Sequence, residues 1–196
     1  LKIGLDEIPP WTYRGLIAPT AALFIFSVGF ISRQRMRVPA GQWKPLIVAS
    51  LFNVMFWHIF SAWGIRLLAS GQASIIAYTM PLWAVLFSMI INKESPTLQR
   101  IVGLGIGLLG LGTLTIGTLG IYELSPNGSI MMLIAAASWG IGTAIHKRVE
   151  WKMPAVALAG WQLLLGGLPI TIIAIFVEHE LWPTVISTIS VAAIFS

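Results

Sequence analysis

The sequence predicts an all-α integral membrane protein, a polytopic helix bundle, on three observations. Hydrophobic residues make up 57% of its 196 residues and charged residues only 10%, whereas a soluble domain carries roughly 25% charged residues. The apolar residues form six successive segments of 18 to 24 residues, and about 20 such residues cross the roughly 30 Å hydrocarbon layer as a helix. The alternating pattern that a closed barrel needs is missing, so helices must satisfy the backbone hydrogen bonds.

The six segments are predicted at residues 11–32, 45–65, 69–91, 101–121, 128–145 and 154–177, with a seventh opening near residue 183. Ser95 and Pro96 precede the fourth segment as a capping hydroxyl and a first-turn proline would. The chain starts at Leu1 and stops inside an apolar run, so we expect a fragment that lacks sequence at both ends.

Basic residues in the loops predict the orientation of the bundle. Loops 33–44, 92–100 and 146–153 together carry nine of the twelve lysines and arginines. The positive-inside rule places these three loops in the cytoplasm, with the protein in the cytoplasmic membrane. Because the net charge of +5 is sorted by loop in this way, nucleic acid is not expected as a partner.

Two segments, 11–32 and 154–177, follow similar proline-containing entrances and lie five helices apart. An odd separation makes them run in opposite directions through the membrane. Inverted repeats of this kind occur in transporters that bind their substrate near the membrane midplane.

The segment 69–91 carries no charged residue and contains Pro81 near its middle. Proline removes a backbone hydrogen bond, which either frees polar backbone for a substrate cavity or leaves a static kink. Tyr78 and Thr79 flank the expected break, and Trp83 faces either the cavity or lipid. We therefore include all four residues in a candidate substrate site.

Polar residues within other segments extend this candidate site. Asn53, Trp57 and His58 lie in segment 45–65, and polar groups at this depth usually face the bundle interior. His58 either carries protons, since its charge changes near neutral pH, or hydrogen-bonds a neighbouring helix. Gln162, after Trp161, needs an amide partner from another helix or from a substrate.

Three further features have competing interpretations. Arg14 lies about one turn inside its segment, where it either snorkels outward or forms a structural ion pair. Gly103, Gly107 and Gly110 share one helix face and are expected to allow close helix packing. Glu94 is expected to be a turn residue or to form an inter-helix ion pair at the cytoplasmic rim, where gating is a further role.

Several stretches of the chain resemble the EamA family of the drug/metabolite transporter superfamily. The run from Gly71 to Trp83, with its small residues leading to a proline, resembles the fourth helix of that family, and Glu94 resembles the glutamate at the following turn. Leu98 to Gly110 is similar to the fifth helix, and 128–148 to the first helix of the second repeat. Tyr13-Arg14 matches the arginine that often opens the second helix, and this resemblance makes Arg14 a candidate anion contact in the substrate site.

The resemblance implies a bundle of five plus five helices in an inverted repeat, of which about six and a half are present. Residues 1–121 would form the first repeat without its first helix, and 128–196 the start of the second. It also implies a transporter, often an exporter, of a small organic metabolite such as an amino acid or drug-like solute. Aromatic and amide residues near the midplane favour a neutral, zwitterionic or aromatic solute.

Two other classes of protein are weighed against a transporter. An intramembrane lipid-modifying enzyme needs clustered His, Asp or Glu, and a non-transporting membrane scaffold would lack a central cavity. The three histidines have no metal-ligand spacing, and the chain has no cysteine, so no catalytic residue, metal or cofactor is predicted. The expected partners are the lipid bilayer and a small-molecule substrate, and the oligomeric state is left open between a monomer and a homodimer.

Overall fold

The computed structural model describes residues 10–95, 97–119 and 125–178, and all regular structure in these ranges is helical. In chain order the elements are α2 (Pro10–Ile31), α3 (Trp43–Ser50), the π-helix η1 (Leu51–Phe56), α4 (Trp57–Leu67), α5 (Ser70–Ala77), α6 (Met80–Asn92), α7 (Leu98–Leu119), α8 (Pro126–Arg148) and α9 (Ala155–Val177).

These helices confirm the predicted all-α membrane fold. Five spans are long and apolar enough to cross a membrane, at Trp11–Ile31, Trp43–Leu67, Ser70–Asn92, Pro126–Arg148 and Ala155–Val177. The remaining predicted segment, the fourth at residues 101–121, corresponds to α7, whose apolar stretch Leu98–Gly110 is shorter. The seventh predicted segment, near residue 183, lies outside the described residues.

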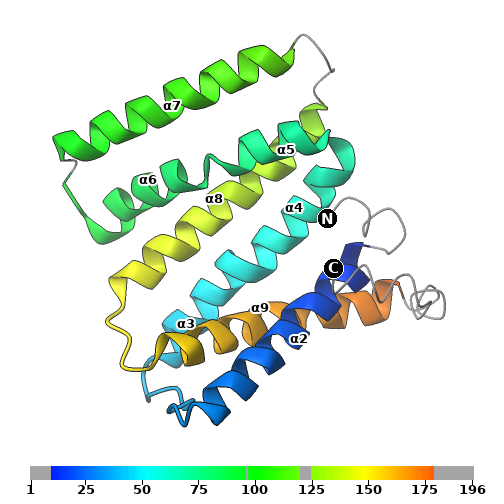
Figure 1. Cartoon of the computed structure of the whole chain (residues 1–196), viewed down its shortest axis with the longest axis vertical. Coiled ribbons are helices and arrows are strands. Elements are labelled where there is room, and N and C mark those ends of the chain that lie inside the picture. Colours follow the sequence, from blue (N-terminus) through cyan, green and yellow to red (C-terminus); the bar gives the residue numbers. More distant parts are fainter. Residues whose placement is uncertain (1–9, 96, 120–124, 179–196) are drawn as a thin grey trace.

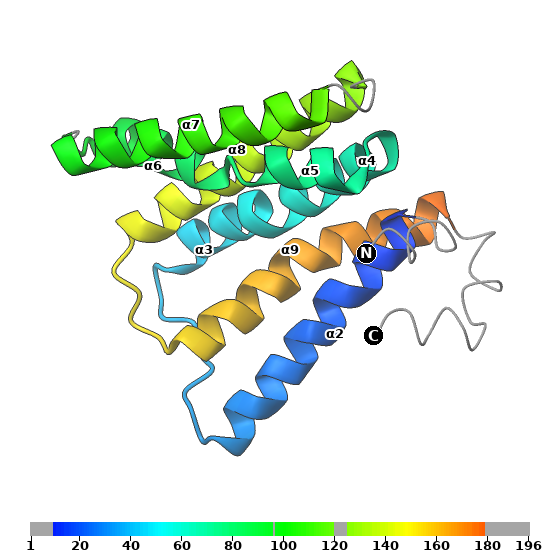
Figure 2. The ribbon, with the colours of Figure 1, turned by 45° about the horizontal axis from the view of Figure 1, so that its top comes forward.

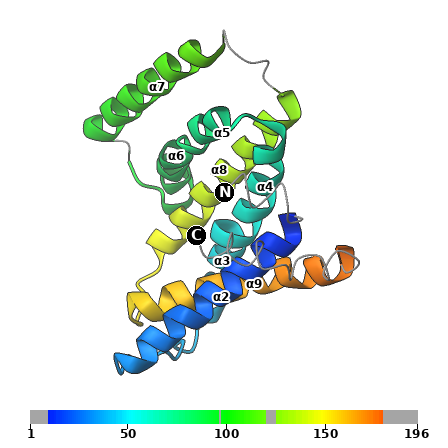
Figure 3. The same cartoon turned by 45° about the vertical axis from the view of Figure 1, so that its right-hand side comes forward.

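The helices form two groups, which Figure 1 and Figure 2 show from different sides. In one group α2 lies along α9, the most extensive pairing in the described chain. In the other, α8 runs through the middle and packs against α6, α4, α5 and η1. The π-helix also contacts α9, and so it connects the two groups. Only a small part of α7 touches α5 and α6, and it lies at the edge of the bundle (Figure 3).

Close packing depends on glycines in α8 and α9. A Cβ atom added at Gly140 would lie 2.7 Å from the backbone carbonyl carbon of Trp83, and one at Gly166 would lie 2.7 Å from the carbonyl oxygen of Ser50. By contrast, nothing lies within 4 Å of the corresponding point at Gly103 or Gly110. At Gly107, the third glycine of the predicted face, the same point lies 3.5 Å from Leu82 Cδ2 of α6, an ordinary contact. The prediction of close packing is therefore wrong for Gly103 and Gly110 within the described part of the chain.

The three basic loops meet at one end of the bundle, which we call the basic end. Glu94 of the α6–α7 loop pairs with Lys147 at the end of α8, at 2.7 Å. Gln42, before α3, donates to the carbonyl oxygen of Glu150 and accepts from the backbone N–H of Lys152, at 2.8 and 3.2 Å. The structure thus brings together the three loops that the charge pattern had grouped.

The cap of α7 differs from the prediction. Ser95 was expected to be the capping residue, but the hydroxyl of Thr97 accepts a hydrogen bond from the backbone N–H of Arg100, at 3.4 Å. The helix begins at Leu98, after the expected position. Two hydroxyl residues flank the proline, and the proline alone does not show which of them caps the helix.

Candidate functional site

The break in the third span lies where Pro81 predicts it. The span divides into α5 and α6 at Tyr78 and Thr79, and Pro81 occupies the first turn of α6. Proline has no N–H to donate to the carbonyl of Ala77, four residues earlier, so the helical hydrogen bonds cannot continue through this point. In membrane proteins, freed backbone of this kind is tolerated where it is buried in protein or lines a cavity.

The four residues around this break do not share one environment. The Thr79 hydroxyl donates to the carbonyl oxygen of Ile76 at 2.6 Å and accepts from the indole N–H of Trp83 at 3.2 Å. Trp83 is half-buried where Gly140 of α8 approaches its backbone. Tyr78, however, is 67% exposed and Pro81 is also exposed. Thr79 and Trp83 therefore face the described bundle, whereas Tyr78 points away from it.

A π-helix carries Asn53 into the contact with α8. Residues Leu51–Phe56 form η1 between α3 and α4, and π-helical turns within membrane helices often occur at functional sites. Gly142 of α8 packs against Asn53, since a Cβ there would lie 2.6 Å from the side-chain amide carbon. Trp57 begins α4 directly after this element and is half-buried. The hydrophobic periodicity of this segment does not reveal the wider π turn.

Arg14 and His58 lie in one buried group. Together with Trp11, Trp63 and Ile170 they line a narrow, partly open space that leaves no room for a water molecule. Arg14 is 8% exposed and makes no ion pair with any described carboxylate, and its guanidinium carbon lies 5.9 Å from the centre of the Tyr13 ring. The structure therefore places Arg14 inside the bundle, neither snorkelling outward nor in a structural ion pair with a described residue.

Several buried polar atoms in the described chain have no hydrogen-bond partner. They are Arg14 Nε, Asn53 Oδ1, His58 Nδ1, Gln72 Nε2, Asn92 Oδ1 and Gln162 Nε2. Buried polar atoms are rarely left unpaired in proteins, and each one calls for an explanation. Four of the six belong to predicted site residues, while Gln72 and Asn92 were missed because each lies at a span end and reads as a terminal polar residue.

One further residue missed by sequence reasoning is Glu178. It is 8% exposed and lies directly after the last residue of α9. Its carboxylate accepts from the backbone N–H and the hydroxyl of Thr12, at 2.8 and 2.7 Å. The first turn of a helix carries unpaired N–H groups and a partial positive charge, so this carboxylate stabilises the start of α2.

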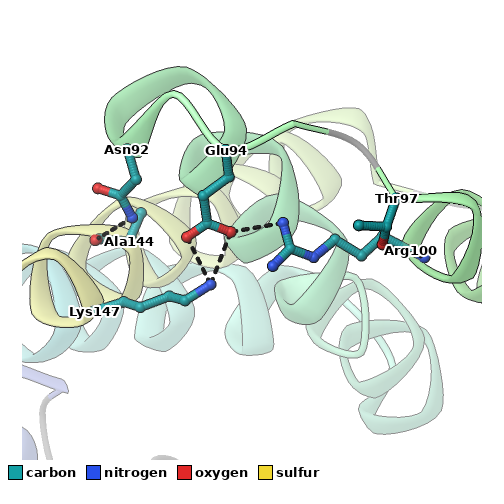
Figure 4. A network of polar contacts seen from close by, with 6 residues as sticks. All are labelled: Asn92, Glu94, Thr97, Arg100, Ala144 and Lys147. Carbon is teal, nitrogen blue, oxygen red and sulfur yellow. Dashed lines mark hydrogen bonds and ion pairs between the residues drawn. The ribbon is translucent and has the colours of Figure 1, made fainter.

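At the basic end, Glu94 forms the inter-helix ion pair that the sequence predicted as one alternative. Its carboxylate lies 2.7 Å from Arg100 Nη1 and 2.7 Å from Lys147 Nζ (Figure 4). The hydrogen bond from Lys147, and then the charges of Lys147 and Arg100, lower the pKa of Glu94 against a smaller opposing effect of burial. Nearby, Asn92 donates to the carbonyl oxygen of Ala144 at 3.1 Å, so α6, α7 and α8 are joined at this end.

No group of three or more His, Cys, Asp or Glu residues that could hold a metal occurs among the described residues.

Comparison with known proteins decides the family. The model of the EamA-like transporter family matches residues 1–116, more than half of the chain. The chain belongs to the EamA-like transporter family. The resemblance seen in Gly71 to Trp83 and in Leu98 to Gly110 is thereby confirmed, since both runs lie within the match.

Several EamA relatives resemble almost the whole chain. It is 27% identical over 179 residues to the uncharacterized transporter YoaV of Bacillus subtilis, covering 91% of this chain and 61% of the relative. It is 26% identical to the uncharacterized inner membrane transporter YedA of Escherichia coli K12, covering 92% and 57%. The WAT1-related protein At3g02690, chloroplastic, of Arabidopsis thaliana is 27% identical, covering 91% and 44%. The chain thus spans about half to three fifths of the length of these relatives.

A crystal structure of another protein shares the fold of this EamA chain. The two align with a TM-score of 0.72 at 21% identity, and the alignment covers 98% of this chain and 66% of the other. At this level of identity the likeness concerns the fold alone.

Proposed function

We propose that the protein exports a small organic metabolite across the cytoplasmic membrane by alternating access. The observation that carries the proposal is the set of unpartnered polar atoms within the spans, on Arg14, Asn53, His58 and Gln162. In a membrane, such groups usually mark a substrate or ion pathway. The transporter names of the relatives support the same class of function.

The Arg14 group favours a solute with a carboxylate. Arg14 is buried beside His58 and has no described anionic partner, so a solute carboxylate would supply the charge that the helices do not. The Asn53 and Gln162 amides and the half-buried rings of Trp57 and Trp83 suit the rest of a zwitterionic or aromatic molecule. An amino acid, or a drug-like solute of similar charge, has both the carboxylate for Arg14 and a zwitterionic or aromatic remainder.

Alternating access requires two arrangements of the helices, and the proposed inverted repeat supplies them. The repeats would divide the chain at residues 1–121 and 128–196, with α2 and α9 as equivalent helices. Two features support this division, the extensive pairing of α2 with α9 and the similar proline-led entrances of the two helices. Rocking of one repeat against the other around a midplane site is the usual mechanism of such transporters.

The proposed orientation in the membrane follows from the basic end. Loops 33–44, 92–100 and 146–153 meet there, and the positive-inside rule assigns that end to the cytoplasm. Glu94 with its two partners would then hold the cytoplasmic side together. Export itself is proposed from the family resemblance, since members of this family are often exporters.

The test is metabolite profiling of the medium of cells that express the complete protein, with an empty vector as reference. The proposal expects a small set of known metabolites outside the cells, lost in Arg14→Gln and Asn53→Ala at equal expression. The matched control is Glu150→Gln, since Glu150 is exposed at the basic end. Cells that express this variant should export normally. A new modified product would point to an enzyme instead, and an unchanged profile in all strains would contradict export.

A further inference from the structure

A second polar feature lies at the basic end, apart from the buried groups within the spans. A cavity of about 340 Å³ opens between the loop after α2 and the start of α9, lined by Arg35, Arg37 and Lys152 together with Gln34, Pro39, Met153 and Pro154. All three cationic side chains are exposed. The transport site proposed above does not include any of these residues.

The loop that carries the two arginines is held in place by backbone contacts. Helix α2 ends with Arg33 in the left-handed region, at φ 51°, and the backbone N–H of Gln34 donates to the carbonyl oxygen of Gly29 at 2.9 Å. This Schellman-type ending turns the chain back along the helix. Further on, the indole N–H of Trp161 donates to the carbonyl oxygen of Met36 at 2.7 Å. Arg35 and Arg37 therefore flank a fixed point of the backbone.

Burial of the next apolar residue fixes the loop at a second point. Val38 is only 3% exposed and packs with Leu46 and Leu158. Arg37 is held between Met36, whose carbonyl is bound to α9, and this buried valine. Because both neighbours are anchored, Arg37 cannot move far from the cavity, and Arg35 lies one residue from the same anchor.

The third cation is anchored separately. Gln42 accepts from the backbone N–H of Lys152 at 3.2 Å and donates to the carbonyl oxygen of Glu150 at 2.8 Å. The α8–α9 loop is thus tied to the segment before α3. The structure thus holds the backbone of two loops so that Arg35, Arg37 and Lys152 line one cavity. None of these anchoring contacts uses the three charged side chains.

These charges are not neutralised within the described part of the chain. The ion pairs found there both belong to Glu94, with Arg100 and Lys147, and Glu150 forms none. Three like charges around one cavity repel each other, and an anion placed among them would relieve the repulsion. Arginine binds phosphate through two parallel N–H bonds, and lysine binds it as a point charge.

We propose that this cavity binds a phosphate-bearing anion through Arg35, Arg37 and Lys152. Two sources share this chemistry, the headgroup of an anionic phospholipid and a soluble phosphate ester. Basic pockets between helices at the cytoplasmic side of membrane proteins are suited to such headgroups. The phosphate would tie the end of α2 to the start of α9.

The test is a binding titration of the purified, delipidated complete protein by native mass spectrometry. The probes are phosphatidylglycerol, phosphatidylcholine as the zwitterionic comparison, and glycerol 3-phosphate as the soluble phosphate. Each cation near an anionic surface contributes roughly fivefold to affinity, so Arg35→Gln/Arg37→Gln should weaken binding roughly 30-fold. The charge-retaining Arg35→Lys/Arg37→Lys variant should bind far more tightly than the glutamine variant.

The matched control removes two charges from the same end but outside the cavity. Lys93→Asn/Arg148→Gln has the same net charge as the glutamine variant, and asparagine tolerates the positive φ of 53° at residue 93. Binding of phosphatidylglycerol alone, lost only in the cavity variant, would support a lipid site. Binding of glycerol 3-phosphate, lost in the same variant, would support a soluble ligand. Equal losses in both variants, or no binding of either anion, would overturn the proposal, and neither result depends on transport.

Discussion

At the scale of single residues, the carboxylates of Glu94 and Glu178 both have side-chain or backbone partners. They lie near opposite ends of the helices and act in different ways. Glu94 joins three helices through exposed and half-exposed partners, whereas Glu178 is buried against the first turn of α2. Neither role is visible from spacing in the sequence, because each depends on a partner more than fifty residues away. The sequence did suggest an ion pair for Glu94, because a lone acid in a basic loop has cations nearby.

The Glu94 network predicts a dependence of stability on pH. Because its cationic partners lower the pKa of Glu94 in the fold, the stabilisation is present above the ordinary pKa of a glutamate, about 4.3. It is lost as the pH falls through the lowered folded-state pKa. Glu94→Gln should therefore melt below the parent protein at neutral pH, and the difference should shrink in acid. Thermal melts in detergent across this pH range measure it.

Glu150→Gln is the control for this experiment, because Glu150 lies at the same end and forms no ion pair with a described residue. Its melting temperature should follow that of the parent protein at every pH. If Glu94→Gln and the parent protein differ equally at neutral and strongly acid pH, the ion pairs are not the cause.

Loss of Glu178 should lower stability more than loss of Glu94, and the cause lies at one place, the start of α2. Removing a buried acceptor that satisfies two donors of Thr12 leaves those donors unpaired, so Glu178→Ala should lower the free energy of unfolding by about 1–3 kcal/mol. The measurement is a double-mutant cycle with Thr12→Val on melting stability. The two effects should be less than additive, and full additivity would show that the pair does not interact in solution.

At the scale of elements, the sequence predicted the spans to within a few residues. Helix length follows from membrane thickness, so apolar runs at 11–32 and 154–177 correspond closely to α2 and α9. The break at Pro81 was predictable as well, because proline lacks the donor that a continuous helix requires. The π-helix at Leu51–Phe56 was not, since no single residue type specifies the wider turn.

Helix contacts were the least predictable part of the fold. A glycine-rich run marks a helix that permits close approach, but the partner helix decides whether the approach happens. The run in α7 lies at the edge of the described bundle, while Gly140 of α8 and Gly166 of α9 closely approach the backbone of other helices. Burial of the polar atoms of Asn53, His58 and Gln162 was predictable for a firmer reason, since polar groups within a span avoid lipid. The orientation of Tyr78 could not be predicted in this way, because an amphipathic ring is tolerated both facing lipid and facing the bundle.

The glycine contacts give a prediction with a matched control. A methyl group at Gly140 would overlap the backbone of Trp83, so Gly140→Ala should cost about 1–3 kcal/mol of stability. Gly103→Ala adds the same methyl group where nothing lies within 4 Å, and the higher helix propensity of alanine should leave stability unchanged or raise it by up to about 1 kcal/mol. Melting temperatures of the two variants make the comparison. A larger loss for Gly103→Ala would contradict the packing described for α8.

At the scale of the whole molecule, the account predicts one orientation in the membrane. These 196 residues contain no cysteine, so single cysteines introduced among them can be compared with the parent protein as background. Glu150→Cys at the basic end should react with a membrane-impermeant maleimide only after cells are permeabilised. Arg66→Cys, exposed at the far end of α4, should react in intact cells. The reverse pattern would place the basic end outside and contradict the proposed orientation.

The central claim is that the unpartnered polar side chains within the spans line a path for solute. Its most direct test is the reactivity of Asn53→Cys and Gln162→Cys in the complete protein toward a small, charged thiol reagent, in intact cells and in inverted vesicles. Alternating access predicts reaction from both sides, and no reaction at Phe24→Cys, an exposed apolar position of α2. If neither polar position reacts from either side while Arg66→Cys does, the buried polar groups are structural and the proposed path does not exist.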